Sequence, residues 1–291
     1  PDLTSVWFFN SREGMATASD GSMLRTNDGG QTWITTAPQN QASSWGNLQF
    51  LADGTGWVQS QNGNIYRTTD KGKTWTSPVD QSSASMSGVS DYHFIDEKNG
   101  WAVKYSPSSS GTAAPAAIFR STDGGISWSP IAGTGEINWL SSIRFADAQN
   151  GVAIGGQNVA YVTSDGGTTW RPRATGAANS LRQVTFIDAT TAIAVGDYGT
   201  VMRSTDRGLT WKNIVAVTNS YLYGVRFISA KVGWAVGSGG SVIHTRDGGL
   251  TWSAQPSGAG MSFTSAFFVN EQTGWIVGAN GTIMATSTGG R

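Results

Sequence analysis

Cysteine is absent from this 291-residue sequence, which excludes disulfides and thiolate metal sites. Charged residues make up only 13% of the chain, and 19 basic residues balance 19 acidic ones. Such a chain has no bulk field that would draw it to nucleic acid or to an anionic membrane. No apolar run approaches the roughly 18 residues that a membrane span requires. We therefore expect no nucleic-acid partner, and with only two histidines we expect no metal site and no cofactor.

The abundant residues are glycine and tryptophan, with 39 and 13 copies. This mixture indicates many tight turns and aromatic contacts rather than helices. The lack of cysteine, together with a first residue that is Pro1 and not Met, fits an exported chain from which a signal peptide has been removed. We expect a periplasmic, lumenal or extracellular location.

An octapeptide with one aspartate recurs through the sequence. Its six copies read TNDGGQTW, TTDKGKTW, STDGGISW, TSDGGTTW, STDRGLTW and TRDGGLTW, with aspartates Asp28, Asp70, Asp123, Asp165, Asp206 and Asp247. Successive aspartates are 42, 53, 42, 41 and 41 residues apart, and a further step of 41 reaches Thr288 in a degenerate seventh copy. A repeat of about 40 residues is typical of a propeller blade of four short strands.

The sequence thus predicts an all-β, seven-bladed β-propeller in one domain over residues 1–291. The expected blades cover residues 1–38, 45–79, 89–131, 140–173, 181–214, 222–256 and 263–291. Five of the blades carry an X-Gly pair suited to a type I′ hairpin between the second and third strands, at Asp20-Gly21, Asn62-Gly63, Tyr198-Gly199, Gly239-Gly240 and Asn280-Gly281. Blade seven should have only three strands, with the edge at 282–286 unpaired and open to a strand from a partner or from chain outside these ends.

The octapeptides are best interpreted as structural. Their Ser, Thr and Asp side chains can bond backbone N–H groups across the turn, the glycines permit left-handed backbone, and the Trp ring caps the hairpin. Aspartates spread evenly around a ring cannot converge on one substrate. We therefore expect no catalytic role for them.

These Asp boxes resemble the bacterial neuraminidase repeat superfamily. The fuller unit, with GWAVG and TRDGGLTW in its sixth copy, is similar to the photosystem II stability/assembly factor family and its non-photosynthetic bacterial relatives, over essentially residues 3–291. That resemblance implies an exported, non-catalytic propeller that assists assembly of a membrane or envelope complex by binding a protein partner. It transfers no specific binding residue, since the repeats carry the match.

Positions that vary between otherwise similar blades are free of the common structural role. Aligning the blades on the Phe of strand one gives two such sets around the channel. The entrance set reads Thr4, Trp45, Ser90, Ser141, Arg182, Tyr223 and Thr264, just after Trp139 and Tyr221, and the deeper set reads Trp7, Gln49, His93, Arg144, Thr185, Arg226 and Phe267. The predicted partner-binding residues are Trp45, His93, Trp139, Arg144, Arg182, Tyr221, Tyr223 and Arg226. The alternative is packing between blades, with each Arg bonded to nearby carbonyls.

Two other functions use the same scaffold. A carbohydrate-binding propeller could stack sugars on Trp45, Trp139, Tyr221 and Tyr223. A glycoside hydrolase would need paired carboxylates, and only Asp91 and Glu136 lie beside adjacent linkers on the expected binding face. That face, formed by the hairpins and the linkers between blades, also carries the one large insertion, within 104–117. The partner's identity and the oligomeric state are not encoded in the repeats.

Overall fold

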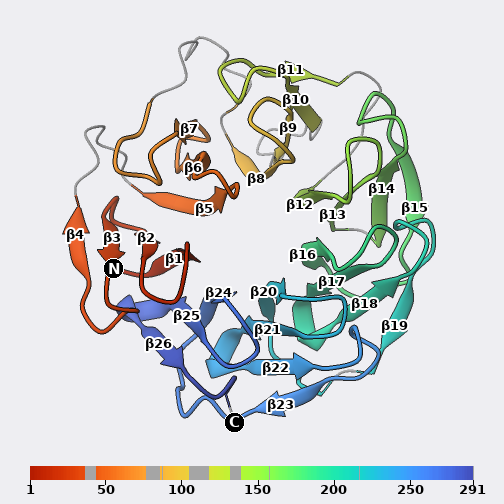
Figure 1. Cartoon of the computed structure of the whole chain (residues 1–291). Helices are drawn as coiled ribbons and strands as arrows, with labels where there is room; N and C mark the ends of the chain where they lie inside the picture. Colours follow the sequence, from red (N-terminus) through yellow and green to blue (C-terminus); the bar gives the residue numbers. More distant parts are fainter. Residues whose placement is uncertain are drawn as a thin grey trace, which may run out of the picture.

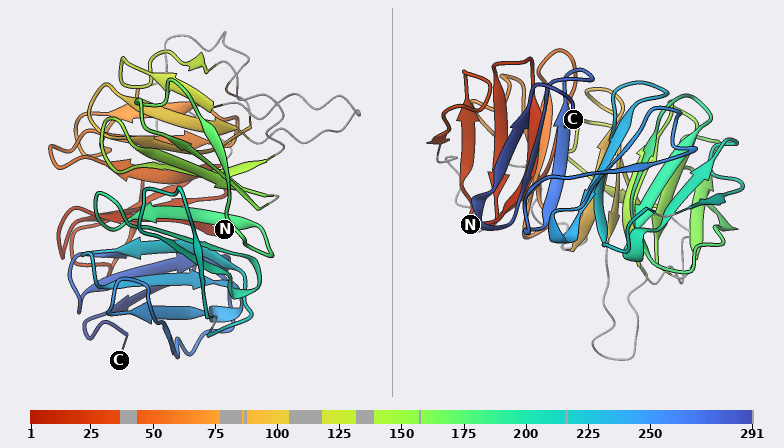
Figure 2. Two further views of the ribbon diagram at one scale, coloured as in Figure 1. Left: turned by 90° about the vertical axis from the view of Figure 1, so that its right-hand side faces the viewer. Right: turned by 90° about the horizontal axis from the view of Figure 1, so that it is seen from below.

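The computed structural model describes residues 1–36, 44–76, 86, 88–104, 118–131, 139–156, 158–215 and 217–290. Seven antiparallel sheets stand around a central channel as the blades of a β-propeller (Figure 1), and the side views show a short, thick ring (Figure 2). The fold class predicted from the repeats is confirmed. Within the described residues, no helix is long and apolar enough to cross a membrane.

Five blades have four described strands, ordered from the channel outward as in the chain. They are blade one, β1 (Leu3–Phe8), β2 (Gly14–Ala18), β3 (Met23–Thr26) and β4 (Ile34–Thr36); blade three, β8 (Val89–Phe94), β9 (Gly100–Lys104), β10 (Ile118–Ser121) and β11 (Ser129–Pro130); blade four, β12 (Leu140–Phe145), β13 (Gly151–Gly155), β14 (Val159–Thr163) and β15 (Arg171–Ala174); blade five, β16 (Leu181–Phe186), β17 (Ala192–Gly196), β18 (Val201–Ser204) and β19 (Lys212–Ile214); and blade six, β20 (Leu222–Phe227), β21 (Gly233–Gly237), β22 (Val242–Thr245) and β23 (Ser253–Gln255).

The other two blades have three described strands each. Blade two consists of β5 (Trp45–Phe50), β6 (Gly56–Ser60) and β7 (Ile65–Thr68), with one further bridge between Arg67 and Thr76. Blade seven consists of β24 (Phe263–Phe268), β25 (Gly274–Gly278) and β26 (Ile283–Thr286), and β25 is the one strand of the described chain that pairs with β26. The three-stranded blade seven predicted from the sequence is confirmed.

Three short 3₁₀ turns are the hairpins η1 (Asp197–Gly199), η2 (Ser238–Gly240) and η3 (Ala279–Gly281). Both central residues of each have positive φ, for example 53° at Tyr198 and 71° at Gly199, as a type I′ turn requires. The same turn was predicted at Asp20-Gly21 and Asn62-Gly63, and this was wrong. There only the glycine has positive φ, so these turns are not type I′.

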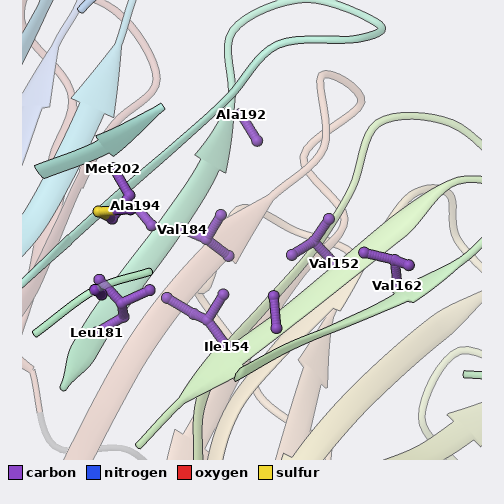
Figure 3. Close-up of a cluster of buried hydrophobic side chains, with 10 residues drawn as sticks. Val152, Ile154, Val162, Leu181, Val184, Ala192, Ala194 and Met202 are labelled. Carbon is purple, nitrogen blue, oxygen red and sulfur yellow. The ribbon is translucent and has the colours of Figure 1, made fainter. Parts of the chain in front are cut away.

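The hydrophobic core lies between neighbouring blades rather than within them. Figure 3 shows one such layer, where Val152 and Ile154 of blade four pack against Val184 and Ala194 of blade five. Blades one and seven join in the same way, through a cluster that includes Phe8 and Trp275. Apolar surface on both faces of each sheet is buried by this arrangement, which closes the ring without a covalent link.

A tryptophan in the second strand fastens each of four blades to the next. The rings of Trp57, Trp101, Trp234 and Trp275 stack on the strand-one Phe of the following blade, with centroids 3.9, 3.7, 3.6 and 3.4 Å apart. Close packing also explains why a glycine precedes each of these tryptophans. A Cβ at Gly274, for example, would lie 2.2 Å from the ring of Phe268 in the adjacent strand. The Phe ring thus occupies the space over the glycine, and the GW pair of the repeat follows from packing.

Each Asp box forms one hydrogen-bonded turn between strands three and four. In blade one, Thr26 Oγ1 accepts from Gly30 N at 2.8 Å and donates to Asp28 Oδ1, which accepts from Thr32 N at 2.9 Å. The hydroxyl of Thr32 reaches Asp28 Oδ2 at 2.6 Å, and this bond is the main reason why the pKa of Asp28 falls to about 2. The same bonds recur at Asp70, Asp123, Asp165, Asp206 and Asp247. In every box the first hydroxyl is buried, whereas the carboxylate is half-buried or exposed.

Candidate functional site

The channel contains a cavity of about 330 Å³. The deeper set of variable positions all line it: Trp7, Gln49, His93, Arg144, Thr185, Arg226 and Phe267. Because these residues occupy one position of the innermost strand in successive blades, the ring brings together side chains that are far apart in sequence. Tyr223 lines the same cavity, so four of the eight predicted binding residues meet there: His93, Arg144, Tyr223 and Arg226.

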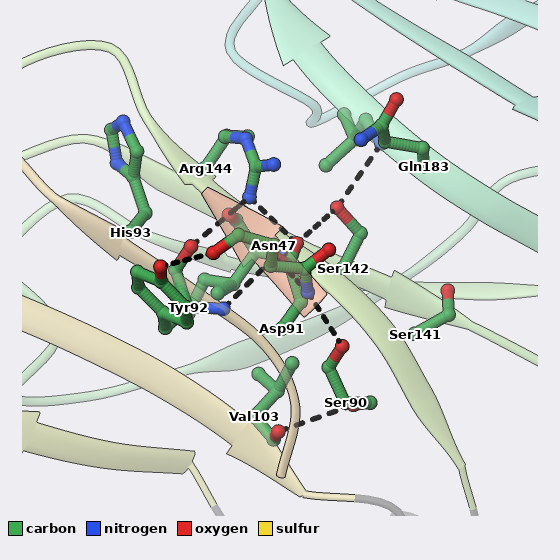
Figure 4. Close-up of polar contacts among 12 residues, drawn as sticks. Asn47, Ser90, Asp91, Tyr92, His93, Val103, Ser141, Ser142, Arg144 and Gln183 are labelled. Carbon is green, nitrogen blue, oxygen red and sulfur yellow. Dashed lines mark hydrogen bonds and ion pairs between the residues drawn. The ribbon is translucent and has the colours of Figure 1, made fainter. Parts of the chain in front are cut away.

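Arg144 is neutralised by a buried acid that was not among the predicted site residues. Its Nη1 lies 2.6 Å from Asp91 Oδ2, and Asp91 is only 4% exposed. Asp91 also accepts from Ser142 Oγ at 2.7 Å, Ile143 N at 3.1 Å and Tyr92 N at 2.9 Å, which Figure 4 shows as one polar network across blades three and four. The sequence could have indicated this residue, because no other blade has an acid at the equivalent position of its innermost strand.

His93 is held as a neutral ring. Its Nδ1 accepts a hydrogen bond from Phe145 N of the next blade at 3.1 Å. Burial, and then the charge of Arg144, lower the pKa of His93 to about 3. At neutral pH this side chain therefore adds hydrogen-bonding capacity to the cavity but no charge.

Arg226 has neither an ion-pair partner nor a hydrogen-bond partner among the described residues. Its guanidinium lies over the rings of Phe267 and Trp7, 4.6 and 5.2 Å from their centroids, and its Nε is buried without a partner. Burial, and then Arg144, lower the pKa of Arg226 to about 10, so it stays protonated at neutral pH. Since Asp91 cancels Arg144, the lining of the cavity keeps one positive charge, and an anionic group such as a carboxylate would neutralise it.

Arg182 belongs to a separate cluster at the hairpin end of the channel. Its Nε is paired with Asp197 Oδ1, and its guanidinium lies 5.6 and 5.5 Å from the rings of Tyr221 and Tyr223. The ring of Tyr221 also contacts Tyr198, at 5.0 Å between centroids, and Tyr198 is 57% exposed. Tyr198 was missed as a site residue. The sequence could have indicated it, because a tyrosine stands here at a turn position that favours Asn, Asp or Gly.

The placement of Trp45 at the channel entrance was wrong. Trp45 is 1% exposed, and its indole N–H donates to Gly21 O of blade one at 2.9 Å. Counting back from Phe50 shows the cause, because Gly46 and not Trp45 is the equivalent of Thr4. Trp139 is half-buried over Gly156 and does not line the cavity. Neither indole therefore offers a sugar-stacking face within the channel.

Two other predicted features lie outside the described residues: the insertion at 105–117 and the residue Glu136. Asp91, the remaining member of the carboxylate pair weighed for hydrolysis, has its oxygens occupied by Arg144 and by backbone and hydroxyl donors. The described part of the chain contains no group of three or more metal-binding side chains.

Comparison with known proteins points to one kind of propeller. The family model described as "Photosynthesis system II assembly factor YCF48" matches residues 209–291, and the "BNR/Asp-box repeat" model matches residues 119–130. A comparison with curated proteins finds no match. This chain resembles the YCF48 propellers.

Solved structures agree with the family models. A structure titled "YCF48 bound to D1 peptide" is similar with a TM-score of 0.76 at 18% identity, covering 99% of this chain and 92% of the other. YCF48 from Cyanidioschyzon merolae gives a TM-score of 0.73 at 21% identity, covering 99% and 95%. The WD40 propeller domain of Doa1 also gives 0.73, at only 9% identity and covering 98% and 92%. At these identities the similarity to YCF48 structures establishes the fold alone. A binding function has to be argued from the residues of the site.

Proposed function

We propose that this protein is an exported, non-catalytic scaffold that binds a protein partner, and that it serves as an accessory or assembly factor of a membrane or envelope complex. The observation that carries the proposal is the unpaired charge of Arg226 in the channel. The two aromatic rings beside this half-buried guanidinium stabilise it only in part, because desolvating a charge is costly and no described residue supplies a hydrogen-bond acceptor. A ligand that supplies the acceptor recovers that cost.

The chemistry of the cavity favours a peptide segment. Trp7 and Phe267 flank Arg226 and offer apolar surface, while Gln49, His93 and Thr185 offer polar groups nearby. A carboxylate on an otherwise uncharged peptide, whether a side chain or a C-terminus, would match this combination. That YCF48 has been solved with a D1 peptide supports peptide binding as a use of this type of propeller.

The hairpin end of the channel provides a second contact zone. Arg182, Tyr198 and Tyr221 are grouped there, and Tyr223 joins them to the cavity. Arginine together with tyrosine is the composition of interface anchors. We propose that the partner covers this end and inserts its acidic group toward Arg226.

The test compares peptides that differ only in charge. An array of envelope-protein peptides would be screened, and each binder would be resynthesised with its carboxylate amidated. We expect amidation of the peptide and the Arg226→Gln variant each to weaken binding about tenfold, with loss of salt dependence. Arg173→Gln is the matched control, since Arg173 lies on the outer strand of blade four and, among the described residues, its side chain bonds Pro172 O alone. Equal affinity for amidated peptides and for Arg226→Gln would contradict the proposal.

A further inference from the structure

One position of the innermost strand joins a blade to the next through a side-chain acceptor. In four blades this side chain accepts the backbone N–H of a residue in the innermost strand of the following blade. The pairs with a neutral acceptor are Ser5 Oγ with Leu48 N, Ser142 Oγ with Val184 N and Gln183 Oε1 with Val225 N, at 3.1, 3.3 and 2.5 Å. In blade three the acceptor is Asp91, whose Oδ2 accepts from Ile143 N at 3.1 Å. Since serine and glutamine make the same bond, the fold requires an acceptor at this position but not a negative charge.

The hydrogen bonds around Asp91 hold it as a carboxylate. Each of its hydrogen-bond partners in the described chain donates to it. The hydroxyl of Ser142 accepts the N–H of Val184, so its own proton is available to Asp91 Oδ2, 2.7 Å away. Tyr92 N donates to Oδ1 at 2.9 Å, and Arg144 Nη1 donates to Oδ2 at 2.6 Å (Figure 4). A carboxyl group that only accepts hydrogen bonds has no place for a proton. Asp91 thus brings a negative charge that the contact between blades does not need.

That negative charge acts on Arg144. Besides its ion pair with Asp91, the guanidinium donates to Ile143 O at 2.5 Å and to Tyr92 O at 3.4 Å. Groups of the protein therefore occupy this arginine. The charged side chains among the residues lining the channel cavity are Asp91, Arg144 and Arg226. Of these three, Arg226 alone keeps a charge without a counter-charge.

Without Asp91, the two arginines would form a site for two negative charges. Both line the same cavity of about 330 Å³. The charge of Arg144 also reaches Arg226, since it contributes, after burial, to the lowered pKa of that guanidinium. With both arginines free, a dianionic group would gain two ion pairs. With Asp91 in place, the second negative charge of such a group would meet a carboxylate instead, and like charges repel.

We propose that Asp91 restricts the channel to ligands that carry a single carboxylate and excludes dianionic groups. It acts through Arg144, whose charge it cancels, and so sets the charge of the cavity at one rather than two. This inference rests on the proposed binding of a carboxylate at Arg226, and it specifies which anionic groups the site accepts.

The experiment compares two small anions, acetate and malonate, which carry one and two negative charges at pH 8. NMR titrations follow the Nε–H signal of Arg226 and the indole N–H signal of Trp7, because both side chains line the cavity. We expect the wild-type protein to bind acetate at least as tightly as malonate. Asp91→Asn should raise the affinity for malonate relative to acetate by about tenfold, because Arg144 is then free to form a second ion pair. The matched control is Asp188→Asn, in a loop at the box end where Asp188 bonds Thr190 and Thr191, and it should keep the wild-type preference.

A second set of variants separates this role from a structural one. Arg144→Gln leaves Asp91 without a counter-charge, so the cavity has no net charge and acetate should bind about tenfold more weakly. Adding Asp91→Asn to Arg144→Gln returns the cavity to one positive charge and should restore both acetate binding and the wild-type preference. A purely structural role predicts no such recovery. Asp91→Ser introduces the residue that blades one and four have at this position, and it keeps an acceptor for Ile143 N.

An unchanged preference in both Asp91→Asn and Asp91→Ser would overturn the proposal, as would a double variant that does not recover acetate binding. In that case the proposed function still stands if peptides bind through a carboxylate at Arg226. The opposite combination is also distinguishable. A raised preference for malonate in the Asp91 variants, with no peptide bound by the wild-type protein, would remove the proposed function and keep Asp91 as the residue that sets the anion preference.

Discussion

His93 should make the stability of this propeller sensitive to mild acid. Its Nδ1 accepts the N–H of Phe145, and burial together with Arg144 opposes protonation, so the pKa of the ring is about 3 in the folded state. In the unfolded chain the pKa returns to about 6.5. Because the folded-state value is the lower one, this contribution to stability is complete above pH 6.5 and is lost progressively as the pH falls toward 3.

The size of the effect follows from these two values. Lowering the pH from 8 to 5 should reduce the free energy of unfolding by about 2 kcal/mol through His93 alone. The box carboxylates contribute little in this window, because their pKa values are lowered in the folded state and the window lies above the value of about 3.9 to which they return in the unfolded chain. His244 does contribute, because burial lowers its pKa as well. Its contribution cancels when the protein is compared with a variant that keeps His244 and lacks His93.

His93→Gln provides that comparison. Gln49 occupies the equivalent position in blade two, where its Oε1 accepts from Phe94 N at 2.9 Å, so a glutamine can replace the ring without orphaning the amide of Phe145. Urea unfolding of both proteins at pH 8 and pH 5 gives two drops in unfolding free energy. We expect the drop to be about 2 kcal/mol smaller in the variant. Equal drops in the two proteins would refute a neutral His93.

Three further predictions concern the boxes, the ring closure and the channel. Asp165→Ala should lower the free energy of unfolding by about 1 kcal/mol through its bonds to Thr169, without changing peptide affinity at low temperature; weaker binding with unchanged melting would show a functional aspartate. Trp275→Phe should destabilise by about 1 kcal/mol more than Trp234→Phe in chemical unfolding, because only Trp275 donates to a carbonyl; equal losses would remove that hydrogen bond from the account of ring closure. The double change Arg182→Ala and Arg226→Ala should weaken the partner complex and flatten its salt dependence in titrations. Neutralising Glu13, Glu97 and Glu271, which lie in the loops between strands one and two at the box end, should not; the reverse result would place the partner at that end.

The sequence by itself determined the architecture. Boxes repeated at intervals of 41 or 42 residues, with one interval of 53, predicted the number and order of the blades, since each repeat is one local unit of antiparallel strands. Even the three-stranded blade seven was readable, because the box pattern is incomplete at Thr288. The turn types at Asp20-Gly21 and Asn62-Gly63 were not readable, because an X-Gly pair suits more than one turn.

The alignment of variable positions determined which side chains surround the channel, as Arg144 and Arg226 show. Their charge states were decided by the tertiary structure alone. Asp91 neutralises Arg144 from an adjacent blade, 53 residues away, while in the described part of the chain the guanidinium of Arg226 faces the rings of Trp7 and Phe267. Trp45 was misplaced because a single residue of register separates the channel rim from the buried interface with blade one. A repeat pattern predicts the contacts within one blade. The pairing of charges and the burial of an indole depend on contacts between blades, which form only when the ring brings the blades together.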